Sequence, residues 1–502
     1  MNRALKRISI AVLVMFLLLM INVNYLQGFE ASSLSTRPDN IRAVSEANQY
    51  ERGDIVTADG VLIAGTTPSD DFYKYQRYYT DGPVYAPVTG YDTIYSTSGV
   101  EEAEDALLSG NGSQLAFRNF IDMITNKPQK GATVYLTINS KAQQAAYEGL
   151  AKILAGKGRV GGVVALNPAT GAILAMASYP SYNPNVLASH DGTTVNNYDE
   201  ALLRENPSPL INNATQTTLP PGSTFKIVTS SAWFTQDTTR NTSSMVYSPQ
   251  VLTLPQTVNK LHNDDGEVCG SAGANGQTTI LWAFSQSCDT TFGNLGIDLG
   301  GQTLNTMAER FGMNDPNLNI PGVTVAPSQY VIPDSPPLAA FSAIGQFSDT
   351  VTPLQEAMFA AAIADNGTLM KPYLIQQVTA SDLTVVQATT PSVLTQQVVS
   401  PTIAGYLKQM MIAVVQDPQG TAFAYNAANE GGLVIAGKTG TAQNLLNGSS
   451  PNPDAVFTAF APANNPKIAV GVMVQGGGYG AAAAAPIAVA VIQAYLATLG
   501  IR

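Results

Sequence analysis

Histidine and cysteine are scarce in this chain, whose 502 residues include only two of each. Zinc and similar metals are usually held by three or four side chains drawn largely from these two types. Two histidines and two cysteines therefore argue against a His/Cys metal cluster. We expect neither a metal nor any other cofactor.

Charged residues are also few, at 12% of the chain, and acidic residues outnumber basic ones by 36 to 25, giving a formal net charge of −11. Proteins that bind nucleic acid gather basic side chains on one face. The composition therefore argues against a nucleic-acid partner. With 45% hydrophobic residues over this length, the chain can bury a large core and is expected to form two or more domains.

Long hydrophobic runs are limited to one segment, Ile8 to Tyr25, which is nearly all apolar and long enough to cross a bilayer. It follows three basic residues, Arg3, Lys6 and Arg7. No small-x-small cleavage site follows in residues 28–33, so an uncleaved signal anchor is favoured over a cleaved signal peptide. Because positive residues stay inside, we expect a short cytoplasmic tail and a single-pass anchor over residues 1–27, with the rest of the chain outside the cell membrane.

The first chemical motif follows Pro220-Pro221-Gly222, a rigid approach that cannot be helical. Ser223 and Lys226 are three residues apart in a segment that reads as the first turns of a buried helix, so the two side chains share a face. We expect this to place the amine within hydrogen-bond reach of the hydroxyl. A desolvated, neutral lysine can take the proton of a serine and make it a nucleophile. Alone, S-x-x-K is a weak signal, and it is more often an N-capping serine beside a solvated lysine.

Two further motifs follow in order, Ser287-Cys288-Asp289 and Lys438-Thr439-Gly440. The set S-x-x-K, S-D-N and K-T-G is the signature of penicillin-binding proteins and serine β-lactamases. On these residues the chain resembles the penicillin-recognising acyl-serine transferases, and more closely the class B penicillin-binding proteins of the penicillin-binding protein A type. The resemblance implies a multi-domain α+β protein. Its transpeptidase domain would be an antiparallel sheet flanked by helices, as in serine β-lactamases, on a small β-rich N-terminal pedestal behind one transmembrane helix.

The resemblance also suggests how the chain is divided. Arg52-Gly53-Asp54-Ile55 resembles the first motif of the class B pedestal, and a hairpin is expected directly after it. We expect a pedestal, or dimerisation-like, domain over 28–130 and the transpeptidase domain over 131–502. Within the latter we expect a strand over residues 131–139, a hairpin over 161–178 and two further strands over 457–462 and 468–474. We also expect a helix over about 140–155, a long apolar helix that the segments 344–346 and 352–355 open and that ends at about 364, and a closing helix over 486–499.

In this family, Ser223 would attack the carbonyl between the two terminal D-alanines of a peptidoglycan stem peptide, with Lys226 as base. Ser287 would relay a proton to the leaving D-alanine. Backbone N–H groups of Ser223 and Thr441 would stabilise the oxyanion. The depressed pKa that Lys226 needs would come from burial and from the like charge of Lys438.

The third motif would bind substrate. Lys438, Thr439 and Thr441 are expected to bind the terminal carboxylate of the substrate, and Gly440 to let an extended peptide pair with the strand edge. Asp289 stands where the commonest motif has Asn. An ionised carboxylate accepts hydrogen bonds only, so we expect Asp289 chiefly to tune Lys226 and the contact with substrate.

The two cysteines, Cys269 and Cys288, would lie outside the cell, where disulfides persist. A bond between them would pin the loop from His262 to Asn275 beside the active site. The two residues could equally be unpaired, buried thiols, and the sequence leaves both states open.

We therefore expect a D,D-transpeptidase that cross-links stem peptides in cell-wall synthesis linked to cell division and is covalently inhibited by β-lactams. The region before residue 131 is too short for a glycan-polymerising domain, so that activity would come from a membrane or divisome partner. A β-lactamase is disfavoured because no E-x-x-L-N-like stretch lies between Ser287 and Lys438. The sequence is also compatible with a D,D-carboxypeptidase that uses the same acyl-serine site, and with a non-catalytic divisome scaffold.

Overall fold

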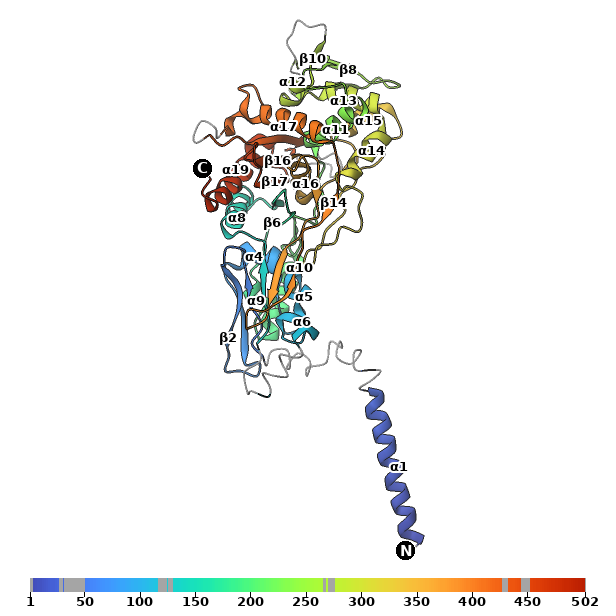
Figure 1. The fold of residues 1–502 in the computed structure, drawn as a ribbon, viewed down its shortest axis with the longest axis vertical. Coiled ribbons are helices and arrows are strands. Elements are labelled where there is room, and N and C mark those ends of the chain that lie inside the picture. The colour runs from blue at the N-terminus through green and yellow to red at the C-terminus, as the bar shows by residue number, and fades with distance from the viewer. Residues whose placement is uncertain are drawn as a thin grey trace.

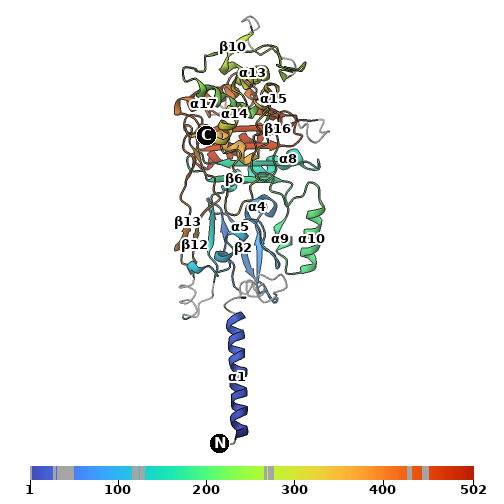
Figure 2. The same ribbon diagram turned by 90° about the vertical axis from the view of Figure 1, so that its right-hand side faces the viewer.

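The computed structural model of the chain describes residues 3–26, 30, 50–115, 124, 130–264, 268–269, 276–426, 432–443 and 452–501. Most of the stretch 28–33, where no cleavage site was found, lies outside these ranges, as do residues 265–267 and 270–275 of the expected loop beside the active site. The described part is elongated, with helix α1 at one end, a sheet with short helices in the middle and a larger mixed domain at the other end (Figures 1 and 2).

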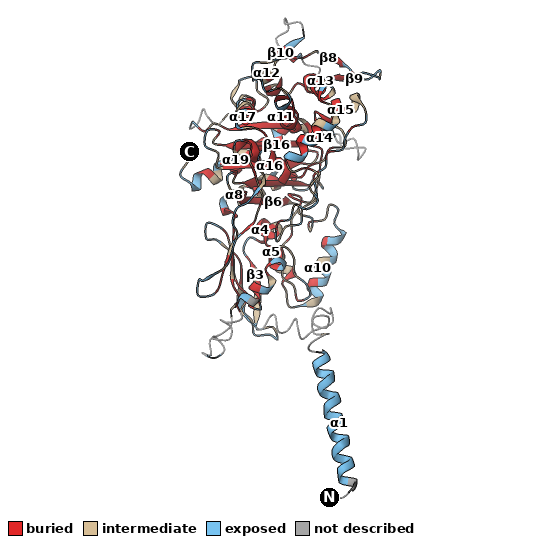
Figure 3. Ribbon diagram, turned by 45° about the vertical axis from the view of Figure 1, so that its right-hand side comes forward, coloured by how far each residue is buried: buried red, intermediate tan, exposed pale blue. Residues whose placement is uncertain are grey.

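Helix α1 (Arg3–Tyr25) contains the expected membrane-spanning segment. Its span Leu5–Tyr25 is fully exposed and has a mean hydropathy of 2.3. A second helix, α19 (Gly480–Thr498), is also long and apolar enough to cross a membrane, but half of its apolar window is buried against the folded domain. Figure 3 shows the same contrast between the two helices. We therefore read α19 as a core helix and α1 as the candidate anchor.

The middle part contains a six-stranded sheet, here called the pedestal sheet, in the order β13-β12-β4-β1-β2-β3. Its strands are β1 (Ile55–Val56), β2 (Leu62–Pro68), β3 (Tyr75–Tyr79), β4 (Thr133–Leu136), β12 (Ile375–Thr379) and β13 (Val385–Ala388). Strands β1 and β2 form the expected hairpin, with Ile55 opposite Ala64. Strand β4 follows the expected boundary at 130/131 and yet pairs with β1, and β12 pairs with β4. The pedestal sheet thus draws strands from both sides of that boundary, which stays a prediction.

The far domain is built on a five-stranded sheet, here called the central sheet, in the order β15-β16-β17-β5-β6, with antiparallel neighbours throughout. Its strands are β5 (Gly161–Leu166), β6 (Ile173–Tyr179), β15 (Ala436–Ala442), β16 (Asp454–Ala461) and β17 (Ile468–Val474). Helices α8 (Ser140–Leu154) and α19 pack together on one face, and α16 (Pro353–Ala364) packs on the other. Because both faces are covered, the strands are buried almost throughout and read as continuous apolar runs.

Most of the expected elements of this domain are present near their predicted bounds, but the last helix begins six residues earlier than expected. The expected start was Pro486, a residue that is common in the first turn of a helix. Instead, Pro486 lies inside α19, and the alanines before it extend the helix back to Gly480. Alanine has the highest helix propensity, which accounts for the longer helix.

The remaining helices lie above the central sheet in Figure 1 and beside the pedestal sheet. Those near the functional motifs are η3 (Gly222–Phe225), α11 (Lys226–Gln236), α12 (Ile280–Ser285), α13 (Asp289–Leu299), α14 (Gly301–Arg310), α15 (Pro336–Ser342) and α17 (Pro401–Gln416). Short ribbons at the top are β7 (Met245–Tyr247) with β10 (Gln277–Thr279), and β8 (Val251–Thr253) with β9 (Lys260–His262). The pedestal carries α4 (Gly82–Thr89), α5 (Gly99–Ala103), α6 (Asp105–Leu108), α9 (Pro184–Leu187) and α10 (Gly192–Arg204).

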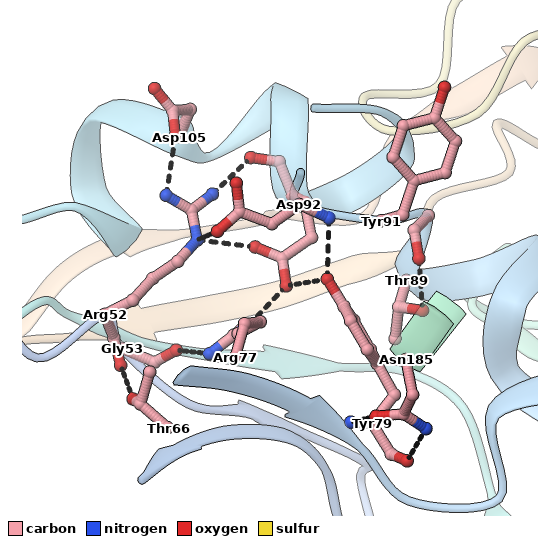
Figure 4. A network of polar contacts seen from close by, with 12 residues as sticks. Arg52, Gly53, Thr66, Arg77, Tyr79, Thr89, Tyr91, Asp92, Asp105 and Asn185 are labelled. Carbon is pink, nitrogen blue, oxygen red and sulfur yellow. Dashed lines mark hydrogen bonds and ion pairs between the residues drawn. The ribbon is translucent and has the colours of Figure 1, made fainter. Parts of the chain in front are cut away.

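A buried ion network holds the pedestal together (Figure 4). The carboxylate of Glu101, which has no exposed surface, accepts hydrogen bonds from Arg52 Nε at 2.7 Å and from Arg77 Nε at 2.6 Å. The Tyr79 hydroxyl donates to the same carboxylate at 3.0 Å. Arg52 also pairs with Asp105 at 2.7 Å. The R-G-x-I motif is thus tied to β3 and α5 through one carboxylate.

Replacing Glu101 by Gln is expected to lower the free energy of unfolding by about 3–5 kcal/mol, because it leaves two buried guanidinium groups short of their shared counter-charge. Asp105→Asn is the matched control. Its partner is the same arginine, but the Asp105 side chain is 50% exposed, so we expect a loss below about 1 kcal/mol. Urea-induced unfolding of both variants tests this, and equal losses would contradict the account.

Candidate active site

Ser223 lies on a tight turn that packs against β15, an edge strand of the central sheet. The turn is the 3-10 helix η3, and α11 continues from it at Lys226. Gly222 has a φ of +54°, and a Cβ added there would lie 2.9 Å from Thr441 O, so a side chain is excluded on both counts. In a 3-10 turn residues three apart eclipse each other, which places Ser223 and Lys226 on the same side.

The Lys226 amine is fully buried and hydrogen-bonded in three directions. Its Nζ donates to Ser287 O at 2.7 Å, to Ser287 Oγ at 3.1 Å and to Asp289 Oδ1 at 2.6 Å. We expected this amine within hydrogen-bond reach of Ser223, but none of its bonds among the described residues goes there. The carboxylate accounts for the difference, because it is the strongest acceptor available to an ammonium group.

Ser287 joins the two lysines of the motifs. Its Oγ accepts from Lys226 Nζ and, at 2.9 Å, from Lys438 Nζ, which also donates to Thr439 O at 3.0 Å. Ser287 has a φ of +60°, a left-handed conformation that costs a non-glycine residue about 1 kcal/mol or more. Ser287 lies in the turn between α12 and α13. In this strained conformation its Oγ is held between the two lysine amines.

The electrostatics of this cluster follow from burial. Burial lowers the pKa of Lys226, and the neighbouring Asp289 carboxylate opposes that effect. Burial lowers the pKa of Lys438 well below its ordinary value of 10.5, and the charge of Lys226 lowers it further. The Asp289 carboxylate thus acts on both buried amines, and the charge of Asp264 also favours the charged form of Lys226. The arrangement favours a charged Lys226 paired with Asp289 beside a Lys438 that loses its proton readily.

The K-T-G motif occupies β15, an edge strand of the central sheet, which packs against η3. That Gly440 lets an extended peptide pair with this edge stays a prediction, and the structure adds a second reason for glycine here. A Cβ at Gly440 would lie 2.7 Å from Pro221 O and 3.1 Å from Thr224 Cγ2. Glycine at this position allows the turn that carries Ser223 to lie against the strand.

A cavity of about 980 Å³ opens over these motifs. Of the expected site residues, it is lined by Ser223, Ser287, Asp289, Thr439 and Thr441, whereas Lys226 and Lys438 are buried at the base of the motifs. Asn263 and Asp264, which also line it, belong to the loop from His262 to Asn275 that a disulfide would hold beside the active site. The sequence did not identify three other lining residues, Gln346, Thr421 and Tyr479.

These additional residues reach the motifs from separate loops. Thr421 Oγ1 lies 2.7 Å from Thr439 Oγ1, and Gln346 Nε2 donates to Thr441 O at 3.5 Å. Neither belongs to a recognisable pattern, so tertiary structure alone places them here. For Asn263, the proximity of Cys269 in the sequence was the one available signal.

Cys269 and Cys288 are joined by a disulfide, so the thiols are paired, a question that the sequence left open. The bond links the middle residue of the second motif to the wall of the cavity. Two hydrogen bonds support the same region, from Ser248 Oγ to Cys269 O at 2.7 Å and from Thr290 N to Asn263 Oδ1 at 2.9 Å. The start of α13 is therefore tied to the loop that follows β9.

Comparison with known proteins agrees with this geometry. Residues 161–493 match the family model of the penicillin binding protein transpeptidase domain, and residues 52–134 match that of the penicillin binding protein A dimerisation domain. The peptidoglycan D,D-transpeptidase PbpA of Mycolicibacterium smegmatis is 39% identical over 503 residues, covering 99% of each chain. The peptidoglycan D,D-transpeptidase MrdA of Escherichia coli K12 is 30% identical over 419 residues, covering 78% of this chain and 61% of MrdA.

Solved structures show the same likeness. The penicillin G acyl-enzyme complex of penicillin-binding protein A from M. tuberculosis matches with a TM-score of 0.81 and 36% identity, covering 89% of this chain and 100% of the other. The D,D-transpeptidase domain of an Eggerthella lenta peptidoglycan glycosyltransferase matches with a TM-score of 0.74 and 31% identity, covering 90% and 99%.

The fold and the family match together define the class: the chain belongs to the penicillin-binding protein transpeptidases. Within that class it is a full-length homologue of the PbpA D,D-transpeptidases, with 38–39% identity to those of two mycobacterial species. The resemblance and the fold class expected from the sequence are confirmed.

Removing the disulfide by replacing both cysteines with serine is expected to lower the free energy of unfolding by roughly 3 kcal/mol, since the bond closes a loop with a sequence separation of 19. Thermal unfolding measures the loss. Intact-mass analysis after thiol alkylation, with and without reductant, checks the bond itself. Two alkylated thiols without reductant would show that the bond is absent.

Proposed function

We propose that the protein is a membrane-anchored peptidoglycan D,D-transpeptidase of cell-wall synthesis. The observation that carries the proposal is the cavity shared by Ser223, Ser287 and Thr439, with two buried lysine amines held against Ser287 beneath it. A nucleophile, a base, a proton route and polar groups for substrate are the parts that peptide acyl transfer requires.

In the first half of the reaction, Ser223 Oγ attacks the carbonyl between the two terminal D-alanines of a stem peptide. The hydroxyl proton passes to a neutral Lys226 amine as the Oγ–C bond forms. Collapse of the tetrahedral intermediate breaks the peptide bond, and the leaving D-alanine nitrogen takes a proton through Ser287. In the second half, the amine of another stem peptide attacks the ester carbonyl and returns the proton to Ser223.

The contacts of Ser287 suggest how Lys226 becomes neutral. Ser287 Oγ lies 3.1 Å from one amine and 2.9 Å from the other, so it can accept a proton from Lys226 while donating its own to Lys438. A substrate carboxylate near Thr439 and Thr441 favours the charged form of Lys438 and thereby draws a proton away from Lys226. We assign Asp289 the opposing influence, since it stabilises the charged form of Lys226 from 2.6 Å.

The placement in the cell follows from α1. Arg3, Lys6 and Arg7 precede the apolar run Ile8 to Tyr25 of the exposed helix, so we propose that α1 crosses the cell membrane with its N-terminus in the cytoplasm and the rest of the chain outside. The pedestal then separates the transpeptidase domain from the membrane. We further propose that a glycan-polymerising or divisome protein in the same membrane supplies the strands to be cross-linked in cell division.

Penicillin, which resembles D-Ala-D-Ala, is expected to form a stable adduct on Ser223 of the purified full-length protein. Intact-mass analysis should show the added mass of one penicillin on the wild type and none on Ser223→Ala. Loss of penicillin without a lasting adduct would favour a β-lactamase. The absence of any reaction would favour a non-catalytic scaffold.

Asp289→Asn is expected to shift the acid limb of the acylation profile to lower pH by at least about one pH unit, because removing the carboxylate lowers the pKa of Lys226 further. Stopped-flow acylation with a fluorescent penicillin between pH 5 and 9 measures the shift. Superimposable profiles would show that Asp289 does not tune Lys226.

A further inference from the structure

Glu356 is a carboxyl group in the core that the chemistry above does not use. It lies on α16, has no exposed surface and does not line the cavity. The helix lies directly on the central sheet there, since a Cβ added at Gly471 of β17 would collide with Ala357 N. Thr458 Oγ1 on β16 donates to Glu356 O at 2.5 Å and fixes the backbone of the helix at this point.

The Glu356 carboxyl contacts the residue next to the nucleophile. Glu356 Oε1 lies 2.7 Å from Thr224 Oγ1, and Thr224 Oγ1 lies 2.8 Å from Pro221 O. A threonine hydroxyl has one hydrogen, and a proline carbonyl can only accept. Both contacts are hydrogen bonds only if Glu356 carries a proton, which it donates to Thr224 while Thr224 donates to Pro221.

Burial points to the same protonation state. Among the described residues, Glu356 Oε2 has no hydrogen-bond partner, which would be very costly for an ionised carboxylate in the core. Burial raises the pKa of Glu356 to about 8, against an ordinary value of 4.5, and outweighs the lowering that a hydrogen bond donated by Thr224 to the carboxylate would cause. A bond donated by Glu356 to Thr224 favours the neutral acid instead.

Other charged groups do not account for this protonation. The elements packed against α16 are β5, β16, β17, α17 and the short strand β11 (Leu369–Met370). Their titratable side chains are Asp454 on β16, and Tyr406 and Lys408 on α17. Of these described groups, none contributes a charge interaction to the titration of Glu356, which is governed by its burial and by the Thr224 hydroxyl.

The hydrogen-bond chain from Glu356 ends at the turn that carries Ser223. Pro221 O, its last acceptor, faces Gly440 of β15, where a Cβ would lie 2.7 Å away. On its other side the turn is held by Gly222 N, which donates to Gly345 O at 3.0 Å. Displacing Thr224 would therefore shift Ser223 relative to β15, where substrate is proposed to bind.

We propose that Glu356 is a positioning residue for the nucleophile: as a neutral acid it donates to Thr224 and so fixes the turn of Ser223 against β15. The proposal rests on the function proposed above and adds a residue outside the three motifs. Ionisation of Glu356 removes the donor and places an unpaired charge behind the turn, so acylation slows as the group loses its proton.

The test compares Glu356→Gln, which keeps a neutral donor, with Glu356→Leu, which has none. Acylation of the full-length protein by a fluorescent penicillin is measured from pH 5 to 9.5. We expect the acylation rate of the wild type to fall above about pH 8. Glu356→Gln should keep most of the wild-type rate and should not show that fall. Glu356→Leu should be at least about tenfold slower than the wild type at every pH. Gln355→Leu is the control for lost packing, because Gln355 on the same helix bonds Phe311 O, away from the turn.

Thermal unfolding over the same pH range provides a readout independent of reaction at Ser223. The folded-state pKa of Glu356 is raised, so the stability that its proton contributes is fully present below about pH 4.5 and is lost as the pH rises towards 8. The Tm of the wild type should therefore fall by several degrees relative to Glu356→Gln between pH 5 and 8.

The outcomes separate the two proposals. If the Tm of wild type and of Glu356→Gln depend on pH in the same way, Glu356 is not a neutral acid in the folded protein. The positioning role is overturned if acylation by both proteins falls equally at alkaline pH. It is also overturned if Glu356→Leu reacts as fast as Gln355→Leu. If Glu356→Leu does not fold, the comparison of wild type with Glu356→Gln still decides. A wild type that does not react with penicillin, yet shows the predicted shift in Tm, would count against the proposed function alone.

Discussion

The active site depends on one electrostatic constraint: two lysine amines are buried around a single serine hydroxyl, with one carboxylate beside them. Lys226 and Lys438 have no exposed surface, and both donate to Ser287 Oγ. Keeping two like charges in such a place is unfavourable, so the cluster releases a proton at a lower pH than an ordinary lysine does. A serine nucleophile needs an acceptor of that kind nearby, and the constraint thereby supplies the base.

The rest of the domain holds this cluster in place. The turn of Ser223 lies between β15 and the segment that leads into α16, and glycines at positions 222 and 440 allow the close approach. The disulfide between Cys269 and Cys288 secures the start of α13, directly beside Ser287 and Asp289. Each motif thus lies on a different element, and the packing of these elements against one sheet produces the site. Helix α16 supports the turn of Ser223 from the side away from the cavity, through the contact between Glu356 on the helix and Thr224 on the turn.

Much of the site was predictable because its chemistry resides in short linear motifs. Ser223 with Lys226, and the tripeptides that begin at Ser287 and Lys438, carry their spacing in the sequence itself. The apolar strands of the central sheet were also readable, since burial on both faces leaves continuous hydrophobic runs. Thr421 and Gln346 were not predictable, because loops without any pattern bring them to the cavity.

Long-range pairing accounts for the other gaps. Strand β12 begins at Ile375 and pairs with β4, whose first residue is Thr133, so the pedestal sheet closes over more than two hundred residues of chain. No local pattern encodes such a partner. The disulfide stayed open for the same reason, as the distance between two cysteines is a tertiary property. The sequence suggested that Lys226 contacts Ser223, but among the described residues it donates to Asp289 instead. Only the fold determines that this competing acceptor lies so near.

The protonation of the two lysines is the central claim, and a ¹³C NMR titration of the protein labelled at lysine Cε measures it most directly. A Lys438→Arg variant assigns the two buried signals. The account predicts that Lys438 titrates well below 10.5 and that Lys226 also titrates below its ordinary range, with its titration displaced when Lys438 is replaced. Two amines that both stay charged up to pH 10 would contradict the account, because no base would then be available to Ser223.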